Sequence, residues 1–235
     1  MKHRPFFCSI ILICAFFTFP LSSTSASVIA TTDIGVQIDY LRWNITTPDF
    51  HPNILSELTF KATSPMGRLN LGWFPENKPW WVTAQYGFGK VVDGSVKDED
   101  FALDDKNGIF SRSKHDSNNH NVQTGIFRVG YGWLGSNRFW ISPNMGFQWQ
   151  FSRFTLEGGK RTIPDNDIDY SQLNSVYSAQ WMALTIGTII HYELSSIPLI
   201  LSADANFFPF ADYTGKGRWN LRADFDQDPS LNMTR

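Results

Sequence analysis

From residue 33 onward, the chain alternates apolar residues with small or polar residues at a period of two. A period of two is typical of β-strands with two different faces, whereas an amphipathic helix repeats every 3.6 residues. In FWISPNMGFQWQF, residues 139 to 151, the odd positions are mostly apolar and the even positions mostly small or polar. The same pattern recurs in DIGVQIDYL, RLNLGW, VTAQYGFG, GIFRVGYGW, QWMALTIGTIIHYEL and LILSADANF. The sequence therefore predicts an all-β, antiparallel fold with about seven strands in this chain.

The first part of the chain has a different character. Basic residues open it, an apolar run extends to Leu21, and small residues follow, with possible cleavage sites after Ala26 and Ala30. This order is typical of a secretory signal peptide, which we expect to cover residues 1–26, with cleavage as late as residue 30. Cys8 and Cys14 both lie inside it, so the exported chain is expected to have no thiol for a disulfide or a metal site.

The connections between the expected strands are alternately short and long. Residues 75–79, 135–138 and 195–196 are short, whereas residues 46–54, 92–120, 157–174 and 214 onward are long and polar. This asymmetry is typical of a transmembrane barrel with tight periplasmic turns and long external loops, and tryptophans flank the short turns as in an interfacial girdle. The sequence therefore predicts an antiparallel transmembrane β-barrel of the cell outer membrane over residues 33–235. A soluble β-sandwich, which also alternates, is the alternative.

In such a barrel the polar strand face points to the lumen. We expect an interior network that contains Arg68, Asn70, Gln85, Arg128, Asn144, Gln148, His191, Glu193, Asp204 and Asn206. These side chains are bulky, which disfavours a wide channel.

The stretch VKDEDFALDD, residues 96–105, carries five acids. We expect it at the outer end of the third strand, entering the longest loop, with Asp98 and Asp100 on one face and Glu99 on the other. A solvated acidic loop is the simpler interpretation. The other is a carboxylate pair that holds a water, in which one pKa would be raised. We expect His51, His115 and His120 to lie in solvated external loops as well.

Several segments in order, ILSELTFK, GWFPENKPWWV, GSVKDEDF, YGWLGSNRFW and FSRFTLEGG, resemble the omptins, outer-membrane proteases of Gram-negative bacteria. The resemblance spans most of residues 33–228. It implies a ten-stranded barrel, of which three strands would be missing from this chain, and a catalytic water between an Asp pair and an Asp–His pair. Asp98 and Asp100 match the first pair. In the second, Asp224 matches the Asp, but Asp226 stands where the His is expected, and a carboxylate is a poor general base near neutral pH.

Two functions therefore remain open. One is an omptin-like barrel whose ancestral activity is that of an endopeptidase that cleaves near basic residues, with a catalytic set that lacks its His in this chain. The other is a non-enzymatic small outer-membrane barrel, either a surface-binding or structural protein or a narrow porin. Neither needs a cofactor or a metal. The expected partners are outer-membrane lipid, including lipopolysaccharide, and a cationic peptide or protein substrate if the site is active; no nucleic acid is expected.

Overall fold

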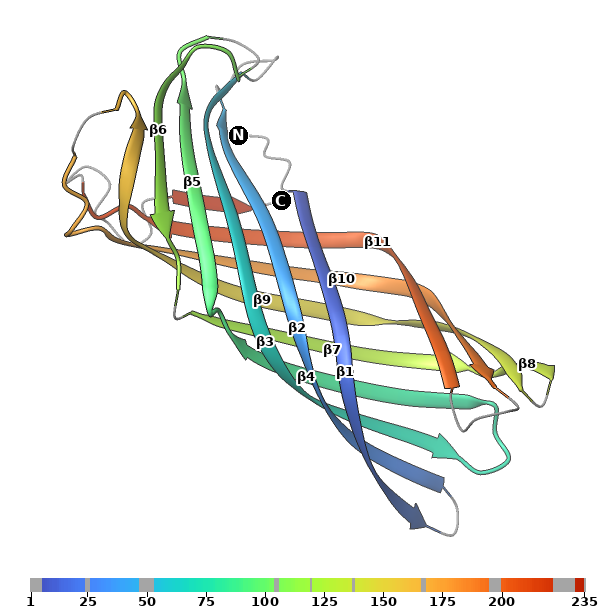
Figure 1. The fold of residues 1–235 in the computed structure, drawn as a ribbon. Coiled ribbons are helices and arrows are strands. Elements are labelled where there is room, and N and C mark those ends of the chain that lie inside the picture. Colours follow the sequence, from blue (N-terminus) through green and yellow to red (C-terminus); the bar gives the residue numbers. More distant parts are fainter. Residues whose placement is uncertain are drawn as a thin grey trace.

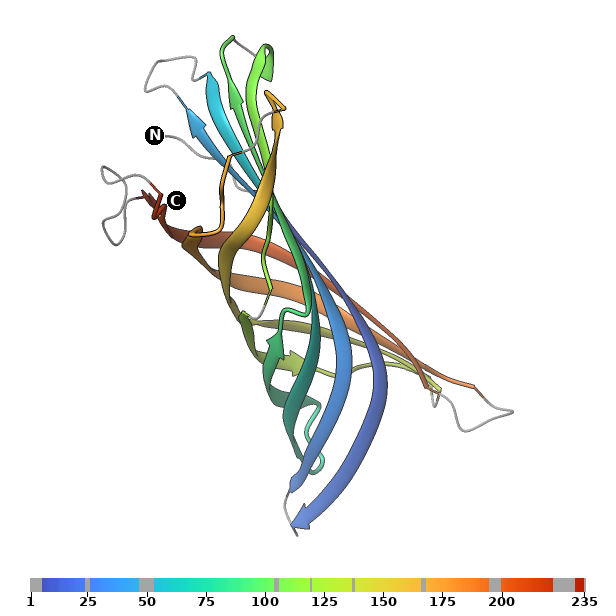
Figure 2. The ribbon, with the colours of Figure 1, turned by 60° about the vertical axis from the view of Figure 1, so that its left-hand side comes forward.

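The computed structural model describes residues 6–23, 26–46, 53–103, 106–118, 120–136, 138–165, 168–194, 200–221 and 231–234. They form one antiparallel sheet that curls around an interior (Figures 1 and 2). The strands along the sheet, in spatial order, are β1 (Phe6–Ser23), β2 (Ala26–Thr46), β3 (Ile54–Pro75), β4 (Trp80–Lys90), β7 (Asn121–Tyr131), β9 (Phe139–Ile163), β10 (Asn174–Glu193), β11 (Ile200–Arg218) and β12 (Leu231–Thr234). In the described part of the chain, no helix has the length and apolar character that crossing a membrane needs.

The predicted all-β architecture is confirmed. The seven alternating segments correspond to β2, β3, β4, β7, β9, β10 and β11, which follow one another across the sheet. The expected short turn at 75–79 joins β3 to β4. The segment expected to be a signal peptide contains β1, which pairs antiparallel with β2 from Phe6 opposite Arg42 to Ser23 opposite Ala26. Its cleavage stays a prediction.

The outer face of the sheet carries an apolar band. On β2, Ile34, Val36 and Ile38 are exposed, while the residues between them point inward and are buried. The band continues around the sheet through Leu69, Leu71, Tyr86, Phe88, Phe127, Val129, Met145, Phe147, Leu184, Ile186 and Phe207. From Val28 to Ile38 the strand rises ~33 Å, which at a tilt of ~40° gives the ~25 Å apolar height of an outer-membrane barrel.

The interior has two levels. Polar side chains fill the level nearer the short turns, and an aromatic core fills the level nearer the long loops, with Trp43, Phe60, Phe154, Tyr177 and Tyr213 at its centre. Ring centroids lie 5.0 Å apart for Phe60 and Phe154 and 5.3 Å apart for Trp43 and Tyr177. Trp43 Nε1 donates a hydrogen bond to the Tyr213 hydroxyl, although the two residues are 170 positions apart. Strands from opposite walls of the curled sheet therefore meet through these side chains.

The long polar stretch at 92–120 is not a loop, contrary to the prediction. Two strands form there, β5 (Asp93–Phe101) and β6 (Ile109–Asp116), and extend the sheet beyond the apolar band (Figure 1). β5 pairs with the outer part of β3, and β6 pairs with the outer part of β9. The strand β8 (Trp133–Ser136) pairs with β9 alone. Strands form here because Val96 and Phe101 are buried and because β3 and β9 continue past the band and offer free edges for pairing.

Candidate functional site

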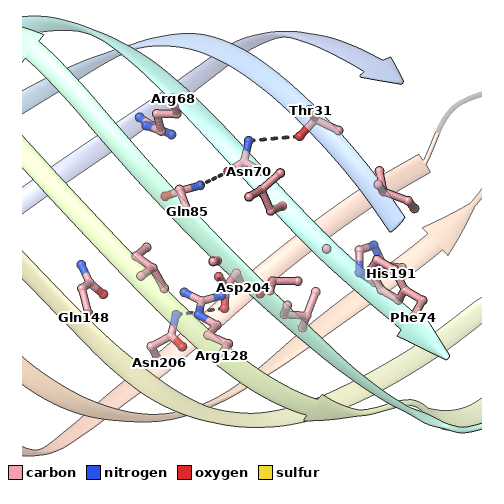
Figure 3. Close-up of a pocket in the computed structure, with 17 residues that line it drawn as sticks. Thr31, Arg68, Asn70, Phe74, Gln85, Arg128, Gln148, His191, Asp204 and Asn206 are labelled. Carbon is pink, nitrogen blue, oxygen red and sulfur yellow. Dashed lines mark hydrogen bonds and ion pairs between the residues drawn. The ribbon is translucent and has the colours of Figure 1, made fainter. Parts of the chain in front are cut away.

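A polar cavity of about 720 Å³ lies in the lower interior (Figure 3). It is built by the inward positions of β2, β3, β4, β7, β9, β10 and β11. Its polar lining consists of Thr31, Arg68, Asn70, Thr83, Gln85, Arg128, Gln148, His191, Asp204 and Asn206. Eight of the ten predicted interior residues therefore line one space; of the other two, Asn144 is buried on the same strand face and Glu193 is exposed at the end of β10.

The charges in this cavity are paired. Arg128 donates to the Asp204 carboxylate, which also accepts a hydrogen bond of 2.9 Å from Asn206 Nδ2. Figure 3 shows these three side chains pointing toward one another from two strands. On the opposite wall, Arg68 Nη1 lies 3.5 Å from Asp33 Oδ1, and Asn70 Nδ2 donates to Asp33 Oδ2 at 2.9 Å. The ionic groups around the cavity are thus paired, and the rest of the lining is partly apolar, with Ile29, Leu71, Phe74, Ile126 and Ile189 beside the amides and hydroxyls.

A buried polar layer separates the cavity from the aromatic core. Asp39 accepts hydrogen bonds from Gln37 at 2.9 Å and from Gln150 at 3.2 Å, which ties β2 to β9. All three side chains are buried. The interior network predicted from the sequence does not include these three residues, although they occupy alternating polar positions of their strands, the same pattern that predicted the other interior residues.

Residues 96–101 of the acidic stretch lie above this level, on β5, whereas Asp104 and Asp105 lie outside the described residues. Asp98 and Asp100 share the inward face, as predicted, and Ser56 Oγ is 3.5 Å from Asp98 Oδ1. Burial, together with the neighbouring Asp100 carboxylate, raises the pKa of Asp98 to about 7. This carboxyl can therefore exchange a proton near neutral pH. The residues expected opposite it, Asp224 and Asp226, lie outside the described residues.

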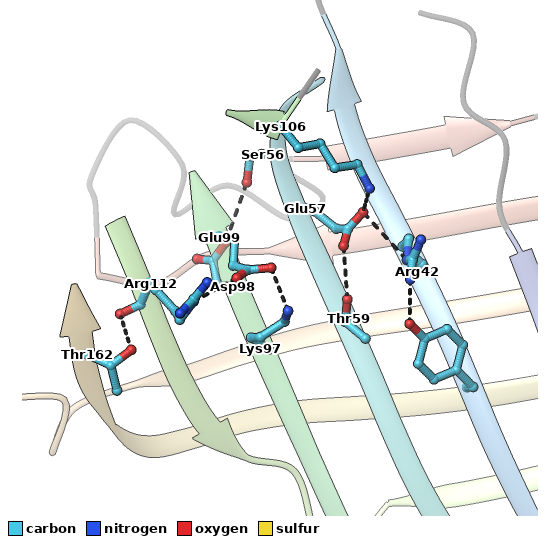
Figure 4. A network of polar contacts seen from close by, with 11 residues as sticks. Arg42, Ser56, Glu57, Thr59, Lys97, Asp98, Glu99, Lys106, Arg112 and Thr162 are labelled. Carbon is cyan, nitrogen blue, oxygen red and sulfur yellow. Dashed lines mark hydrogen bonds and ion pairs between the residues drawn. The ribbon is translucent and has the colours of Figure 1, made fainter. Parts of the chain in front are cut away.

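Glu99 points to the other face of β5 and joins a network of ion pairs (Figure 4). Its carboxylate lies 2.6 Å from Lys97 Nζ and 2.7 Å from Arg112 Nε. Burial opposes the ionisation of Glu99, but the hydrogen bonds from these two cations outweigh it and hold its pKa below the usual value. On β3, Glu57 is paired in the same way with Lys106 and with Arg42. These acids stabilise the external strands and are not free for chemistry.

Two of the three histidines expected in solvated loops, His115 and His120, are buried instead. His115 lies in β6, where its Nδ1 donates to the Gly158 carbonyl at 2.7 Å and its Nε2 accepts from Ser113 Oγ at 2.7 Å. Its ring packs edge-on against Tyr170 at 4.9 Å. Burial lowers the pKa of His115 and likewise that of His120. His115 therefore joins β6 to the outer end of β9. His51 lies outside the described residues. His191 lines the cavity, as predicted, where it bonds Ser202 Oγ at 2.8 Å.

A family model described as Pom, Protochlamydia outer membrane protein, matches residues 31–234. Comparison with curated proteins gives no match. The Pom match overturns the omptin resemblance, and that prediction is wrong. The short segments behind it include aromatic-flanked turns, which outer-membrane barrels share for physical reasons.

Two further predictions rested on that resemblance and are no longer supported by it. They are the ten-stranded barrel and the catalytic roles given to Asp98, Asp100, Asp224 and Asp226. The predicted cellular location stands. The chain belongs to the Protochlamydia outer membrane protein family and is an antiparallel β-barrel protein of the outer membrane.

Proposed function

We propose that this protein is a non-enzymatic outer-membrane barrel that holds a rigid external extension at the cell surface. The observation that carries the proposal is the aromatic core across the upper interior. Phe60 and Tyr177 are each 1% exposed and Leu156 is fully buried, so the core is shielded from solvent as the centre of a soluble domain is. A passage from the cavity to the outside would have to cross this layer.

The extension is stiff because it is tied on both faces. Inside, the core joins β3 and β5 to β9 and β10; outside, the ion pairs of Glu57 and Glu99 link β2, β3, β5 and β6. A stiff, charged surface beyond the membrane suits a structural or surface-binding protein, because little conformational entropy is lost when a partner binds.

A narrow pore is the second candidate, and the polar cavity favours it. A lining of paired arginines, amides and hydroxyls is what a water-filled lumen needs. The pore would be closed in the structure described here, with the aromatic core as its barrier.

Conductance in planar bilayers separates the two. The purified protein is expected to pass no current, whereas a Phe60→Ala/Tyr177→Ala variant, which removes two rings from the core, is expected to show steps if it folds. Resistance to heat-induced mobility shift on gels checks that the variant is folded. Steady conductance steps from the wild type would overturn the proposal and favour the pore.

A further inference from the structure

The ladder between β6 and β9 is a weak seam in the external sheet. It is interrupted by two register shifts, and it places Lys114 opposite Lys160 and Asp116 opposite Glu157. All four side chains are exposed on the outward face. Like charges directly opposite one another on neighbouring strands repel. Among the described residues, no ion pair joins β6 to β9 to offset this repulsion.

The strand β6 is held more firmly on its other side. Its ladder with β5 runs from Ser95 to Phe101, and Arg112 on β6 forms an ion pair with Glu99 on β5 (Figure 4). The two strands therefore form one hairpin, which stands beyond the apolar band (Figure 1). If the external sheet opens locally, the seam with β9 is where the hairpin separates from its neighbour.

Asp98 lies on the inward face of this hairpin with no cation opposite it. The ladders place it between Leu58 of β3 and Ser113 of β6, and they place Asp100 between two serines. Leu58 is 4% exposed and belongs to the aromatic core. A negative charge on Asp98 would therefore be held between a second carboxylate and an apolar surface, which is unfavourable.

The other ionisable groups around Asp98 do not neutralise it. Burial raises the pKa of Tyr177 on β10 and lowers the pKa of His115, at the next inward position of β6. Arg161 of β9 donates to neutral groups, a carbonyl and a serine hydroxyl, at 3.1 and 3.2 Å. Glu99 points to the other face of β5, where its own two cations hold it. The charge of an ionised Asp98 thus stays uncompensated while the hairpin is closed.

We propose that Asp98 is a proton-operated latch that controls the opening of the β5–β6 hairpin along its seam with β9. With its proton, Asp98 is neutral and the hairpin packs on the core. Without it, the buried charge is relieved when the seam opens and water reaches the carboxylate. The proposal goes beyond the proposed function and does not depend on it, because the hairpin stands outside the membrane whether or not the barrel conducts.

The test is hydrogen–deuterium exchange of the full chain in phosphatidylcholine nanodiscs at pH 6 and pH 8. Backbone amides of residues 109–116 and 157–163 report how often the seam opens, and amides of β7 and β10 in the apolar band are the reference. Three proteins are compared: the wild type, Asp98→Asn and Lys160→Gln. Lys160→Gln is the matched control, because it removes one charge of the seam and leaves the latch intact.

The expected effect follows from the pKa of Asp98, which burial raises from 3.8 to about 7 in the closed hairpin. If the pKa returns to 3.8 in the open hairpin, seam exchange in the wild type relative to Asp98→Asn should rise about 10-fold from pH 6 to pH 8. Taking this ratio cancels the opposing effect of His115, which both proteins share. Lys160→Gln should slow seam exchange about threefold at both pH values and keep the same dependence on pH.

A ratio of wild-type to Asp98→Asn exchange that is equal at pH 6 and pH 8 would overturn the proposal. Seam amides that exchange no faster than those of β7 and β10 would overturn it as well, because exchange would then report unfolding of the whole barrel. Loss of the pH effect in Lys160→Gln would assign that effect to the charges of the seam rather than to Asp98.

Discussion

Replacing Asp98 with Asn should make the protein more stable near neutral pH and should remove part of its pH dependence. The pKa of Asp98 is raised from 3.8 to about 7, mainly by burial. A carboxyl whose pKa is raised on folding favours the folded state fully below pH 3.8, and that contribution is lost as the pH rises through 7. The difference between 3.8 and about 7 corresponds to ~4 kcal/mol above pH 7. Acidification from pH 8 to pH 5 should therefore recover about 2.5 kcal/mol of unfolding free energy.

The assay is urea unfolding of the refolded protein in lipid vesicles at several pH values, followed by tryptophan fluorescence. The quantity compared is the difference in unfolding free energy between wild type and Asp98→Asn. This difference cancels the contribution of His115 and His120, whose lowered pKa values make acid destabilise both proteins equally. The neutral amide can still accept the Ser56 hydrogen bond. Asp165→Asn, which removes an exposed carboxylate, is the matched control. A difference between wild type and Asp98→Asn that stays constant from pH 5 to pH 8 would refute the reasoning.

Three further predictions concern the external extension. Phe60→Ala should lower the unfolding free energy by ~3–5 kcal/mol, because it opens a cavity in the core. Phe88→Ala, on the lipid-facing side, should lower it less. Equal losses of unfolding free energy in the same urea assay would count against a packed core. Gly159→Ala should make the outer part of β9 more sensitive to proteolysis, since Gly159 has φ 122° and a Cβ there would lie 2.3 Å from His115 Nδ1. Gly158→Ala is the control and should raise the sensitivity less, because the space around Gly158 is open. Greater sensitivity of Gly158→Ala than of Gly159→Ala would contradict the packing described. Glu99→Gln should cost about 1 kcal/mol at pH 7, because Lys97 and Arg112 stabilise the Glu99 carboxylate and lower its pKa. The cost should decrease as acid protonates Glu99 in the folded protein, and a cost that does not change with pH would rule out the ion pairs as its source.

The membrane-spanning part of the fold could be predicted from the sequence because lipid outside and polar side chains inside impose a period of two. That is why Arg68, Arg128 and Asp204 were correctly placed in the interior. Beyond the membrane the constraint disappears. In β5 the outward residues Lys97 and Glu99 are charged, and the inward face combines Val96 with the acids Asp98 and Asp100, so too few apolar residues alternate to indicate the strand.

The burial of His115 was missed for a related reason. Its neighbours in the sequence, KHDSNNH, are polar, while the Gly158 carbonyl and the Tyr170 ring that enclose it are about 40 to 55 positions away. The omptin resemblance failed because it relied partly on aromatic-flanked turns, which outer-membrane barrels share for physical reasons.

The proposed function depends most directly on the closure of the interior by the aromatic core at its outer end. Thr83 lines the polar cavity, so Thr83→Cys in a Cys8→Ser/Cys14→Ser background places one thiol below the aromatic core. Intact cells are treated with a membrane-impermeant maleimide too large for outer-membrane diffusion, with Lys97→Cys on the external strands as the positive control. If the aromatic core closes the interior, Lys97→Cys is labelled in intact cells and Thr83→Cys is labelled only after the outer membrane is permeabilised. Labelling of Thr83→Cys in intact cells at the rate of Lys97→Cys would contradict it.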